Sequence, residues 1–293
     1  MRILHLDAGK EMRGGQWQVL RLLEGLTAEG VESTLLAREG APLFEAARRK
    51  RWRVEPLGLM RTLLWARKHD LIHAHDARSH TLGALVPGTP LVVSRRVAFP
   101  VGSHWKYGRA RCYLAVSEFV KSVLLQGGVP EEKIAVVFDG VPLLQPGRGT
   151  AVLALANASD TQKGQSLAVE AARLAAVPLR LTSDLERDLP NAGLFVYITH
   201  SEGLGSAVLL AMSAGVPVVA SRVGGLPEII RNRENGLLVD NSAHDIAAAI
   251  RELVDHPHRG ELLGKAARRA VQEHFTTDHM VRRTMEVYRR VLS

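Results

Sequence analysis

The chain has 293 residues, of which 46 % are hydrophobic and 23 % charged, and its formal net charge is +8. This length allows two domains of ordinary size, and the composition excludes a disordered chain. No apolar run reaches the roughly 20 residues of a membrane-spanning helix. The single cysteine, Cys112, excludes an internal disulfide and a multi-cysteine zinc site. Because Met1-Arg2 leads directly into an apolar strand, we expect no secretory signal and a cytoplasmic location.

The positive charge is concentrated in the first half of the chain. Residues 1–145 contain 21 lysines and arginines against 14 acids, whereas residues 146–293 contain 17 against 16. The run Arg48-Arg49-Lys50-Arg51, with Arg53, could attract the phosphates of an anionic lipid or a phosphorylated acceptor. A solvated helix end explains the run equally well. We expect no nucleic-acid partner, because no helix-turn-helix signature, RNP-like strand or zinc finger accompanies the charge.

The first half alternates apolar strands with helices, which is typical of a parallel sheet. The pattern predicts strands at 3–6, 33–37, 54–57, 70–76, 91–94, 113–117 and 134–138, and helices at 16–28, 42–50, 61–68 and 118–125. Gly14-Gly15 is expected in the loop before the first helix. The turn-rich stretch 145–149, QPGRG, predicts a domain boundary.

Polar side chains follow two of these predicted strands. His75 and Asp76 end one strand and could hydrogen-bond an acceptor hydroxyl. Arg95-Arg96 follow the next strand and could hold a phosphate or a carboxylate. His73 stands two residues before His75, but no third ligand is tied to this pair in the sequence, so we expect no metal site.

The second half continues the same alternation. The predicted strands are 151–156, 178–181, 194–198, 218–220 and 236–239, and the predicted helices are 165–175, 206–214, 245–254 and two more that end with 280–292. Residues 194–228 contain the best functional lead. Gly203 and Gly205 let the backbone approach a ligand, and the helix that starts near Ser206 directs unpaired N–H groups toward it. This geometry predicts a phosphate-binding site at the helix N-terminus, which we call the seat, with Glu202 at its edge. A tight turn with a solvated Glu202 fits the glycine spacing equally well.

The longer pattern carries a resemblance. Residues 201–205 (SEGLG), 211–221 (AMSAGVPVVAS) and 224–228 (GGLPE) resemble the donor-site signature of family-four retaining glycosyltransferases of the GT-B type. The resemblance implies two Rossmann-like parallel-sheet domains that face each other across a cleft. Residues 1–145 would bind the acceptor and residues 146–276 the nucleotide-sugar donor. Residues 277–293 would form a C-terminal helix that packs back on the N-terminal domain.

The resemblance also implies the site. The expected catalytic residues are Glu202, Lys163 and Arg96. The expected donor-binding residues are Gly14, Gly15, Lys163, Thr182, Glu202, Gly203, Leu204, Gly205 and Ser206. The expected acceptor-binding residues are His75, Asp76 and Arg95. Because Lys163 and the helix N-terminus would neutralise the donor diphosphate, we expect no cofactor and no metal.

Several positions depart from the family pattern. The second glutamate of the motif, eight residues after Glu202, is replaced by Leu210. The usual arginine is absent at Ala158, and Arg96 stands where many relatives have a histidine. The stretch between 178 and 194 is short, so the donor domain looks trimmed.

Two functions therefore stay open. One is a retaining transferase that moves a sugar from a nucleoside-diphosphate sugar to a glycan or lipid-linked acceptor. It would act in cell-envelope or lipopolysaccharide-type synthesis, at the anionic inner face of the plasma membrane. The other is a catalytically weak GT-B-like protein that binds nucleotide sugars or serves as a partner subunit. A GT-B-shaped epimerase would need acid/base residues that we do not find.

Overall fold

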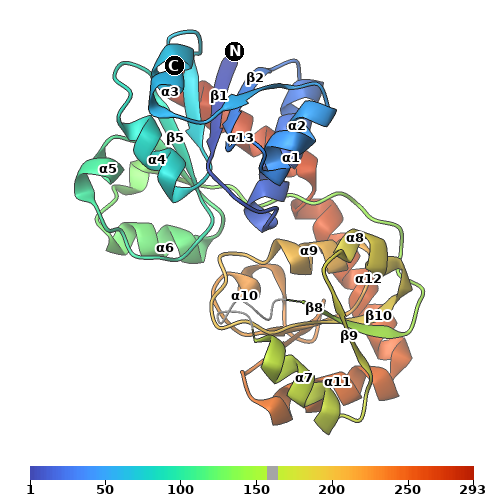
Figure 1. Ribbon diagram of the computed structural model, residues 1–293. Coiled ribbons are helices and arrows are strands. Elements are labelled where there is room, and N and C mark those ends of the chain that lie inside the picture. Colours follow the sequence, from blue (N-terminus) through green and yellow to red (C-terminus); the bar gives the residue numbers. More distant parts are fainter. Residues whose placement is uncertain (157–163) are drawn as a thin grey trace. The chain divides into compact units, whose positions relative to one another are not determined.

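The computed structural model describes residues 1–156 and 164–293, which form two compact units (Figure 1). Unit 1 comprises Met1–Gly140 and Thr277–Ser293, and unit 2 comprises Val141–Thr276. Each unit is a parallel β-sheet with helices packed on it, which confirms the predicted α/β class with two Rossmann-like sheets. The chain leaves unit 1 between Gly140 and Val141, before the 145–149 linker.

Unit 1 is built on a seven-stranded sheet in the order β3-β2-β1-β4-β5-β6-β7. Its strands are β1 (Arg2–Asp7), β2 (Glu32–Ala37), β3 (Arg53–Pro56), β4 (Leu71–Ala74), β5 (Leu91–Arg95), β6 (Cys112–Ala115) and β7 (Ile134–Val136). Its helices are α1 (Gly14–Ala28), α2 (Pro42–Arg49), α3 (Leu59–Ala66), α4 (Ala77–Ala84), α5 (His104–Gly108), α6 (Glu118–Gln126), the 3₁₀ turn η1 (Glu131–Lys133) and α13 (Thr277–Leu292).

The C-terminal helix α13 completes the core of unit 1. Its buried side chains Met280, Val281 and Tyr288 pack in one cluster with Leu22 and Leu26 of α1. The two helices meet closely at Gly25, where an added Cβ would lie 2.4 Å from Val281 Cγ2. Residues from opposite ends of the chain therefore share one hydrophobic core.

Unit 2 is built on a five-stranded sheet in the order β12-β11-β10-β8-β9. Its strands are β8 (Ala151–Leu155), β9 (Leu179–Thr182), β10 (Ala192–Tyr197), β11 (Val218–Ser221) and β12 (Leu237–Val239). Its helices are α7 (Gln165–Leu174), α8 (Leu185–Asp188), the 3₁₀ turn η2 (Leu189–Asn191), α9 (Ser206–Ser213), α10 (Leu226–Ile229), α11 (Ala243–Asp255) and α12 (Pro257–His274).

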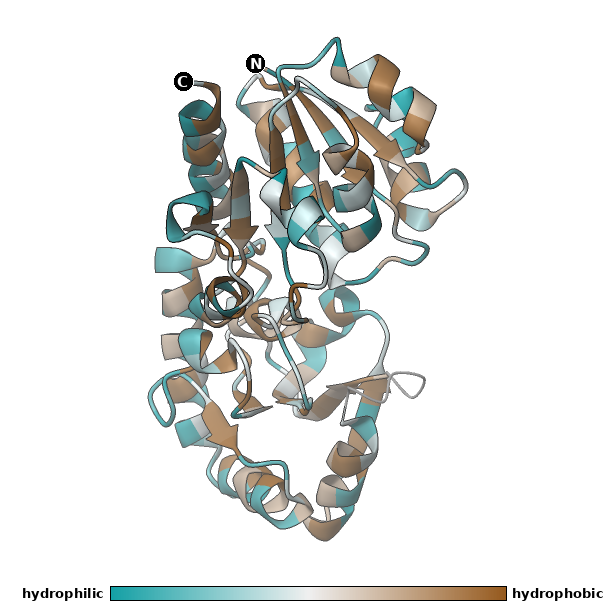
Figure 2. Cartoon of the chain, turned by 90° about the vertical axis from the view of Figure 1, so that its left-hand side faces the viewer, coloured by the Kyte–Doolittle hydropathy of each residue, from teal (hydrophilic) through white to brown (hydrophobic). Residues whose placement is uncertain are grey.

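The sequence forms these elements because its apolar residues match their periods. The central strands are buried on both faces and mostly apolar, as is typical of parallel sheets, and Figure 2 shows the strands largely in brown. Helix α11 buries Ile246, Ile250 and Leu253 on one stripe, with polar residues elsewhere around the helix. None of the helices in the described ranges combines the length and the apolar character that a membrane crossing needs.

Two expectations about local structure were wrong. Gly14 and Gly15 do not lie in a loop, because Arg13 is the N-cap of α1 and its carbonyl already accepts the N–H of Trp17 at 3.1 Å. Helix α4 was not predicted, since its sequence ARSHTLGA has little apolar period. Helix α4 begins immediately after Asp76 of the candidate site, and helix α1 begins with the predicted donor residues Gly14 and Gly15, so these corrections affect the chemistry of the site.

Candidate functional site

Each sheet has one point where the strand order reverses, and in open parallel sheets ligands bind beside that point, at the carboxyl ends of the strands. In unit 1 the reversal lies between β1 and β4. In unit 2 it lies between β8 and β10. The loops that follow these strands contain most of the predicted site residues.

In unit 2, the loop after β10 ends in a helix N-terminus that has the geometry of an anion seat. Gly205 is the N-cap of α9 and is left-handed, with φ 106°, and an added Cβ there would lie 2.6 Å from Leu226 Cδ2. The first bond within the helix runs from the N–H of Leu209 to the carbonyl of Gly205 at 3.0 Å. The amides of Ser206 and the two residues after it thus have no acceptor within the helix and carry the positive end of its dipole.

Glu202 is fixed at the start of this seat. The hydroxyl of Tyr197, at the end of β10, donates to Glu202 Oε2. The N–H of Gly203 donates to Glu202 Oε1 at 3.0 Å. Gly203 and Leu204 are buried, so Leu204 offers a ligand only its backbone, while Glu202 and Ser206 are half-buried. The carboxylate is therefore oriented before any ligand arrives.

A second glycine pair packs directly on the loop that carries Glu202. The N–H of Gly225 donates to the carbonyl of Glu202 at 3.2 Å. An added Cβ would lie 1.9 Å from Glu202 O at Gly224 and 2.1 Å from Gly203 O at Gly225. Gly224 is also left-handed, with φ 57°. Only glycine allows the two loops to approach this closely.

A buried polar network holds the base of the same loop. Thr199 donates its N–H to Ser221 Oγ at 3.0 Å, and Ser221 donates its hydroxyl to Asn241 Oδ1 at 2.6 Å. The side-chain amide of Asn241 returns a bond to the carbonyl of Thr199 at 2.9 Å. Three strand ends, those of β10, β11 and β12, are thereby tied together, which makes the seat rigid.

The other predicted donor-binding residues of unit 2 are Lys163 and Thr182. Lys163 and Ala158 lie outside the described residues. Gly164, which follows, donates its N–H to the carbonyl of Ile198 at 2.9 Å. Thr182 is buried, its hydroxyl donates to Asp188 Oδ2 at 2.6 Å, and its carbonyl accepts the N–H of Ala156. The hydroxyl and carbonyl of Thr182 are therefore engaged inside the protein.

In unit 1, Asp76 is a helix cap. Its Oδ1 accepts the N–H groups of Arg78 and Ser79 at 2.8 and 3.0 Å. Its Oδ2 accepts the N–H of Ala8 and the hydroxyl of Ser79, both at 2.6 Å. Both oxygens of the carboxylate thus accept bonds from protein donors, and the expected contact with an acceptor stays a prediction. It ties the end of β4 to the loop after β1.

Arg95 and Arg96 separate in the structure. Arg95 is buried, donates to the carbonyl of Phe99 and lies over the ring of Tyr107. These contacts hold the loop after β5, Arg95 Nε is buried without a partner among the described residues, and the expected acceptor contact stays a prediction. Arg96 forms an ion pair with Asp139, 3.2 Å from Nε to Oδ1, and its Nη1 is buried without a partner among the described residues. Arg96 therefore keeps an unused donor.

Two residues that the sequence did not single out complete the polar cluster of unit 1. Asp7, at the end of β1, is almost fully buried and accepts bonds from the Gly9 N–H at 2.8 Å and from Gln16 Nε2 at 3.2 Å. Burial, followed by the nearby Asp76, raises the pKa of Asp7 to about 6. Gln16 lies in the first turn of α1, and an added Cβ at Gly15 would lie 3.9 Å from Arg96 Cδ.

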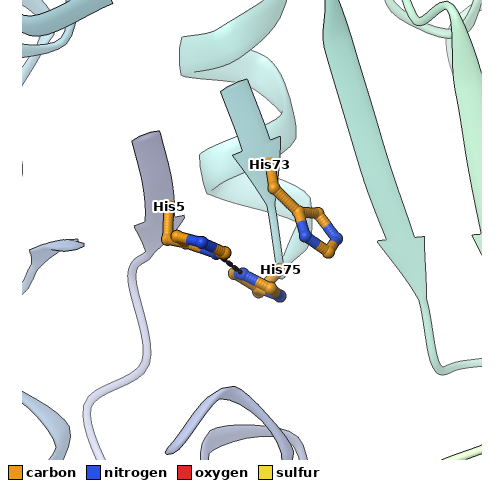
Figure 3. A group of neighbouring side chains, drawn as sticks. All are labelled: His5, His73 and His75. Atoms are coloured by element: carbon orange, nitrogen blue, oxygen red, sulfur yellow. Dashed lines mark hydrogen bonds between the residues drawn. The ribbon is translucent and has the colours of Figure 1, made fainter. Parts of the chain in front are cut away.

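The second residue that the sequence did not single out is His5. It is a third histidine beside His73 and His75, whereas the sequence predicted no further ligand for this pair. Strand β1 pairs with β4 in a register that sets His5 beside His73. His5 Nδ1 lies 3.0 Å from His75 Nε2. Figure 3 shows the three imidazoles gathered at the ends of the two strands. A period-two pattern within one strand cannot reveal such a neighbour.

The basic run at residues 48–53 is exposed and largely ion-paired. The distances from side-chain nitrogen to carboxylate oxygen are 3.6 Å for Arg48 and Glu45, 2.8 Å for Lys50 and Glu24, and 3.8 Å for Arg53 and Glu32. The run is therefore a solvated surface with a reduced net field.

Family models match both units. Residues 12–143 match the model described as Glycosyltransferase Family 4, and residues 163–270 match Glycosyl transferases group 1. The parts of the chain that form unit 1 and unit 2 are therefore each similar to glycosyltransferase domains. The motif at residues 201–228 lies inside the group 1 match.

Solved structures and curated relatives agree with this class. The Anabaena protein Alr3699/HepE, in complex with UDP and glucose, has a TM-score of 0.86 at 16 % identity over 99 % of this chain and 100 % of that one. The sucrose-phosphate synthase of Thermosynechococcus elongatus has a TM-score of 0.79 at 18 % identity, with coverages of 99 % and 98 %. At these identities the likeness concerns the fold.

Among curated proteins, the α-maltose-1-phosphate synthase of Mycolicibacterium smegmatis is 37 % identical over 117 residues, 38 % of this chain. The D-inositol 3-phosphate glycosyltransferase of Acidothermus cellulolyticus is 42 % identical over 98 residues, 32 % of this chain. The matched parts span only 30 % and 21 % of these two relatives.

Proposed function

We propose that this chain is a retaining glycosyltransferase that moves a sugar from a nucleoside-diphosphate sugar to an acceptor hydroxyl. The observation that carries the proposal is the pre-formed seat of unit 2, where Gly205 opens helix α9 beside an oriented Glu202. Its position after β10, at the strand reversal, is where nucleotide ligands bind in such sheets. The group 1 family match over the same residues supports this proposal.

The chemistry follows from charge. The bond between the anomeric carbon and the diphosphate oxygen breaks, and the acceptor oxygen bonds to that carbon on the same face. The leaving phosphate gains negative charge and takes the acceptor proton. Helix dipoles and N–H groups fixed near that phosphate lower the barrier without reorganisation. In this proposal Glu202 orients the sugar hydroxyls, Lys163 helps to neutralise the diphosphate, and this step needs no metal.

UDP-glucose is the first donor to test, because the Anabaena neighbour was solved with UDP and with UDP-glucose. A transferase should slowly release UDP from UDP-glucose in the absence of an acceptor. Glu202→Gln should lower that release about 100-fold, equivalent to ~2.7 kcal/mol of transition-state stabilisation. Glu170→Gln, an exposed glutamate of α7, is the matched control and should release UDP at the wild-type rate. Equal rates in the two variants would remove Glu202 from the mechanism.

We propose further that the acceptor carries a phosphate or carboxylate, which Arg96 binds with its free Nη1. The names of two relatives contain a phosphorylated sugar and a phosphorylated polyol, which supports this choice of acceptors. Arg96→Gln should raise the KM for a phosphorylated acceptor about 10–100-fold while leaving donor hydrolysis unchanged. Arg78→Gln, on the exposed side of α4, is the control. A KM for the acceptor that is unchanged in Arg96→Gln would contradict this assignment.

A second candidate is a catalytically weak protein that binds nucleotide sugars. Leu210 favours it, because a leucine in place of the second glutamate removes a charged contact to the ribose, which costs about 1–3 kcal/mol. Saturable binding of UDP-glucose with no UDP release above the blank would establish this candidate. If Leu210→Glu restored the release of UDP, the contact made by the second glutamate of the motif would be the one that this chain lacks.

We also propose that the transferase acts in cell-envelope glycan synthesis at an anionic membrane surface, through the loop after β5 and the helix α5 that follows it. Phe99 and Trp105 are 65 % and 56 % exposed there, and Lys106 follows directly. Aromatic rings beside cations suit a lipid headgroup region. Co-sedimentation should be salt-sensitive with phosphatidylglycerol vesicles and absent with phosphatidylcholine vesicles. Phe99→Ser/Trp105→Ser should abolish it, whereas Met60→Ser, 69 % exposed on α3, should not.

A further inference from the structure

The three histidines at the reversal of the unit 1 sheet form a compact group of neutral ligands. His5 stands on β1, His73 on β4, and His75 directly follows β4, where its N–H continues the ladder to the carbonyl of Leu6 at 3.0 Å. Neighbouring strands in register and a spacing of two place all three side chains on one face of the sheet. Their ring centroids are 4.0 to 5.6 Å apart.

Burial leaves two nitrogens of this group without use. His5 and His73 have no exposed surface, and His75 is 6 % exposed. His5 Nε2 and His75 Nδ1 are buried and have no hydrogen-bond partner among the described residues. Buried polar atoms without a partner are rare in native proteins and call for an explanation.

The charge state suits coordination of a cation. Burial favours the neutral form of all three imidazoles, and a neutral imidazole has a lone pair on one nitrogen that a metal ion can accept. The cation Arg96 lies near, but its charge is balanced by the ion pair with Asp139.

The distances also suit coordination. Within the described residues, His5, His73 and His75 bring one ligand atom each within 4.8 Å of one another. Nitrogens on a tetrahedral zinc ion are about 3.3 Å apart, for Zn–N bonds of about 2.05 Å. The 3.0 Å between His5 Nδ1 and His75 Nε2 is close to that value, so these two nitrogens can hold an ion in place of their mutual hydrogen bond, and the unpartnered His5 Nε2 and His75 Nδ1 are the second nitrogens of the same rings.

The surroundings can orient the ligands. His73 is held by two hydroxyls, with Nδ1 2.6 Å from the hydroxyl of Tyr288 and Nε2 2.8 Å from that of Ser94. Tyr288 comes from α13 and Ser94 from β5. Coordination replaces one of these hydroxyls, and the other still fixes the ring, as partners of metal-bound histidines do.

We propose that His5, His73 and His75 bind one divalent transition-metal ion of the zinc type, separate from the diphosphate seat of unit 2. Three imidazoles without a carboxylate favour zinc, copper or nickel over magnesium and calcium. The ion would tie β1 to β4 and stabilise unit 1, and it adds to the proposed transfer reaction without taking part in it.

The test uses the full chain, without a polyhistidine tag, after treatment with a chelator. Titration with zinc chloride should give one bound ion per chain by calorimetry and elemental analysis. At 100 times the Kd, zinc should raise the Tm by about 5–10 °C, whereas magnesium chloride should not. X-ray absorption of the zinc form should give three imidazole ligands, a result that needs no variant.

Variants separate this site from surface binding. His75→Asn should lose the ion and the shift in Tm, whereas the double variant His256→Asn/His258→Asn removes an exposed pair and should retain both. Fewer than about 0.1 ions per chain would overturn the proposal. A bound ion lost only from the double variant, or an absorption spectrum without imidazole ligands, would also overturn it. UDP release from UDP-glucose tests the transferase separately, because that step depends on Glu202.

Discussion

The two candidate sites of this chain are built in opposite ways. The seat of unit 2 comes from one continuous stretch, residues 194–228, in which strand, loop, helix and glycine pair follow one another. The polar cluster of unit 1 is collected from the ends of separate strands, with Asp7 as the last residue of β1, His75 after β4, Arg96 after β5 and Asp139 after β7. A site formed by one continuous stretch can be predicted from the sequence. The composition of a site formed by separate strands depends on the strand order and register, which the sequence does not show directly.

The contrast extends to what the carboxylates do. In unit 2, Glu202 accepts two bonds that orient it beside open helix amides. In unit 1, Asp76 has each oxygen engaged by two protein donors, and Asp7 is buried. A carboxylate at the end of a parallel strand can therefore serve either a ligand or the fold, and the neighbouring backbone decides which.

The largest effect should come from the glycine pair of unit 2. Gly224→Ala adds a Cβ 1.9 Å from Glu202 O at φ 57° and should cost ~3–5 kcal/mol, the sum of left-handed strain and overpacking. Gly88→Ala has a similar φ of 80° but open space, and should cost only about 1–2 kcal/mol. Urea unfolding measures both. Equal losses would mean that backbone conformation, and not the contact with the seat, explains Gly224.

The second effect concerns pH and Asp7. Its folded pKa of about 6 lies above the ordinary 3.8, so the folded state binds more protons between pH 4 and 6. The contribution of Asp7 to stability is present below pH 4 and is lost as the pH rises through 6. Asp7→Asn should therefore gain stability relative to wild type across this window, by about 3 kcal/mol at most.

Chemical denaturation of both proteins at several pH values measures this difference. The comparison is necessary because His5, with its pKa lowered to about 3, acts in the opposite direction and destabilises unit 1 as the pH falls. A stability difference between Asp7→Asn and wild type that does not change with pH would contradict the raised pKa.

The third prediction tests whether Asp76 serves as a helix cap or as a ligand of the acceptor. Asp76→Ala removes the N-cap of α4 and the tie to Ala8, and should cost about 2 kcal/mol. Ser242→Ala removes the N-cap of α11 in unit 2, where the hydroxyl accepts the N–H of Asp245 and donates to its carboxylate, and should cost about 1 kcal/mol. A loss of acceptor affinity in Asp76→Asn with unchanged stability would restore the original expectation of an acceptor contact.

The smallest effect should come from the basic run. Lys50→Ala breaks an exposed ion pair with Glu24 and should change the free energy of unfolding by about 0.5 kcal/mol or less. It should also leave vesicle binding unchanged, in contrast to Phe99→Ser/Trp105→Ser. A strong loss of vesicle binding in Lys50→Ala would show that the basic run, and not the aromatic residues after β5, contacts the membrane.

The sequence by itself determined the alternation of strands and helices, the two-unit organisation and the loop from Glu202 to Ser206. These features depend on short-range patterns, namely apolar periods, glycines at fixed offsets and a helix start, which act within a few residues. It did not reveal α4, whose stability depends on the Asp76 cap more than on an apolar stripe.

Only the tertiary structure decided which dispersed residues meet. Parallel pairing of β1 with β4 brings His5 beside His73 across 68 residues of chain, and α13 brings Tyr288 to the same ring. It also placed Arg95 against its own loop and Arg96 against Asp139, each with one buried guanidinium nitrogen that has no partner among the described residues. Strand register and side-chain burial are set by packing of the whole sheet, so no local pattern contains them.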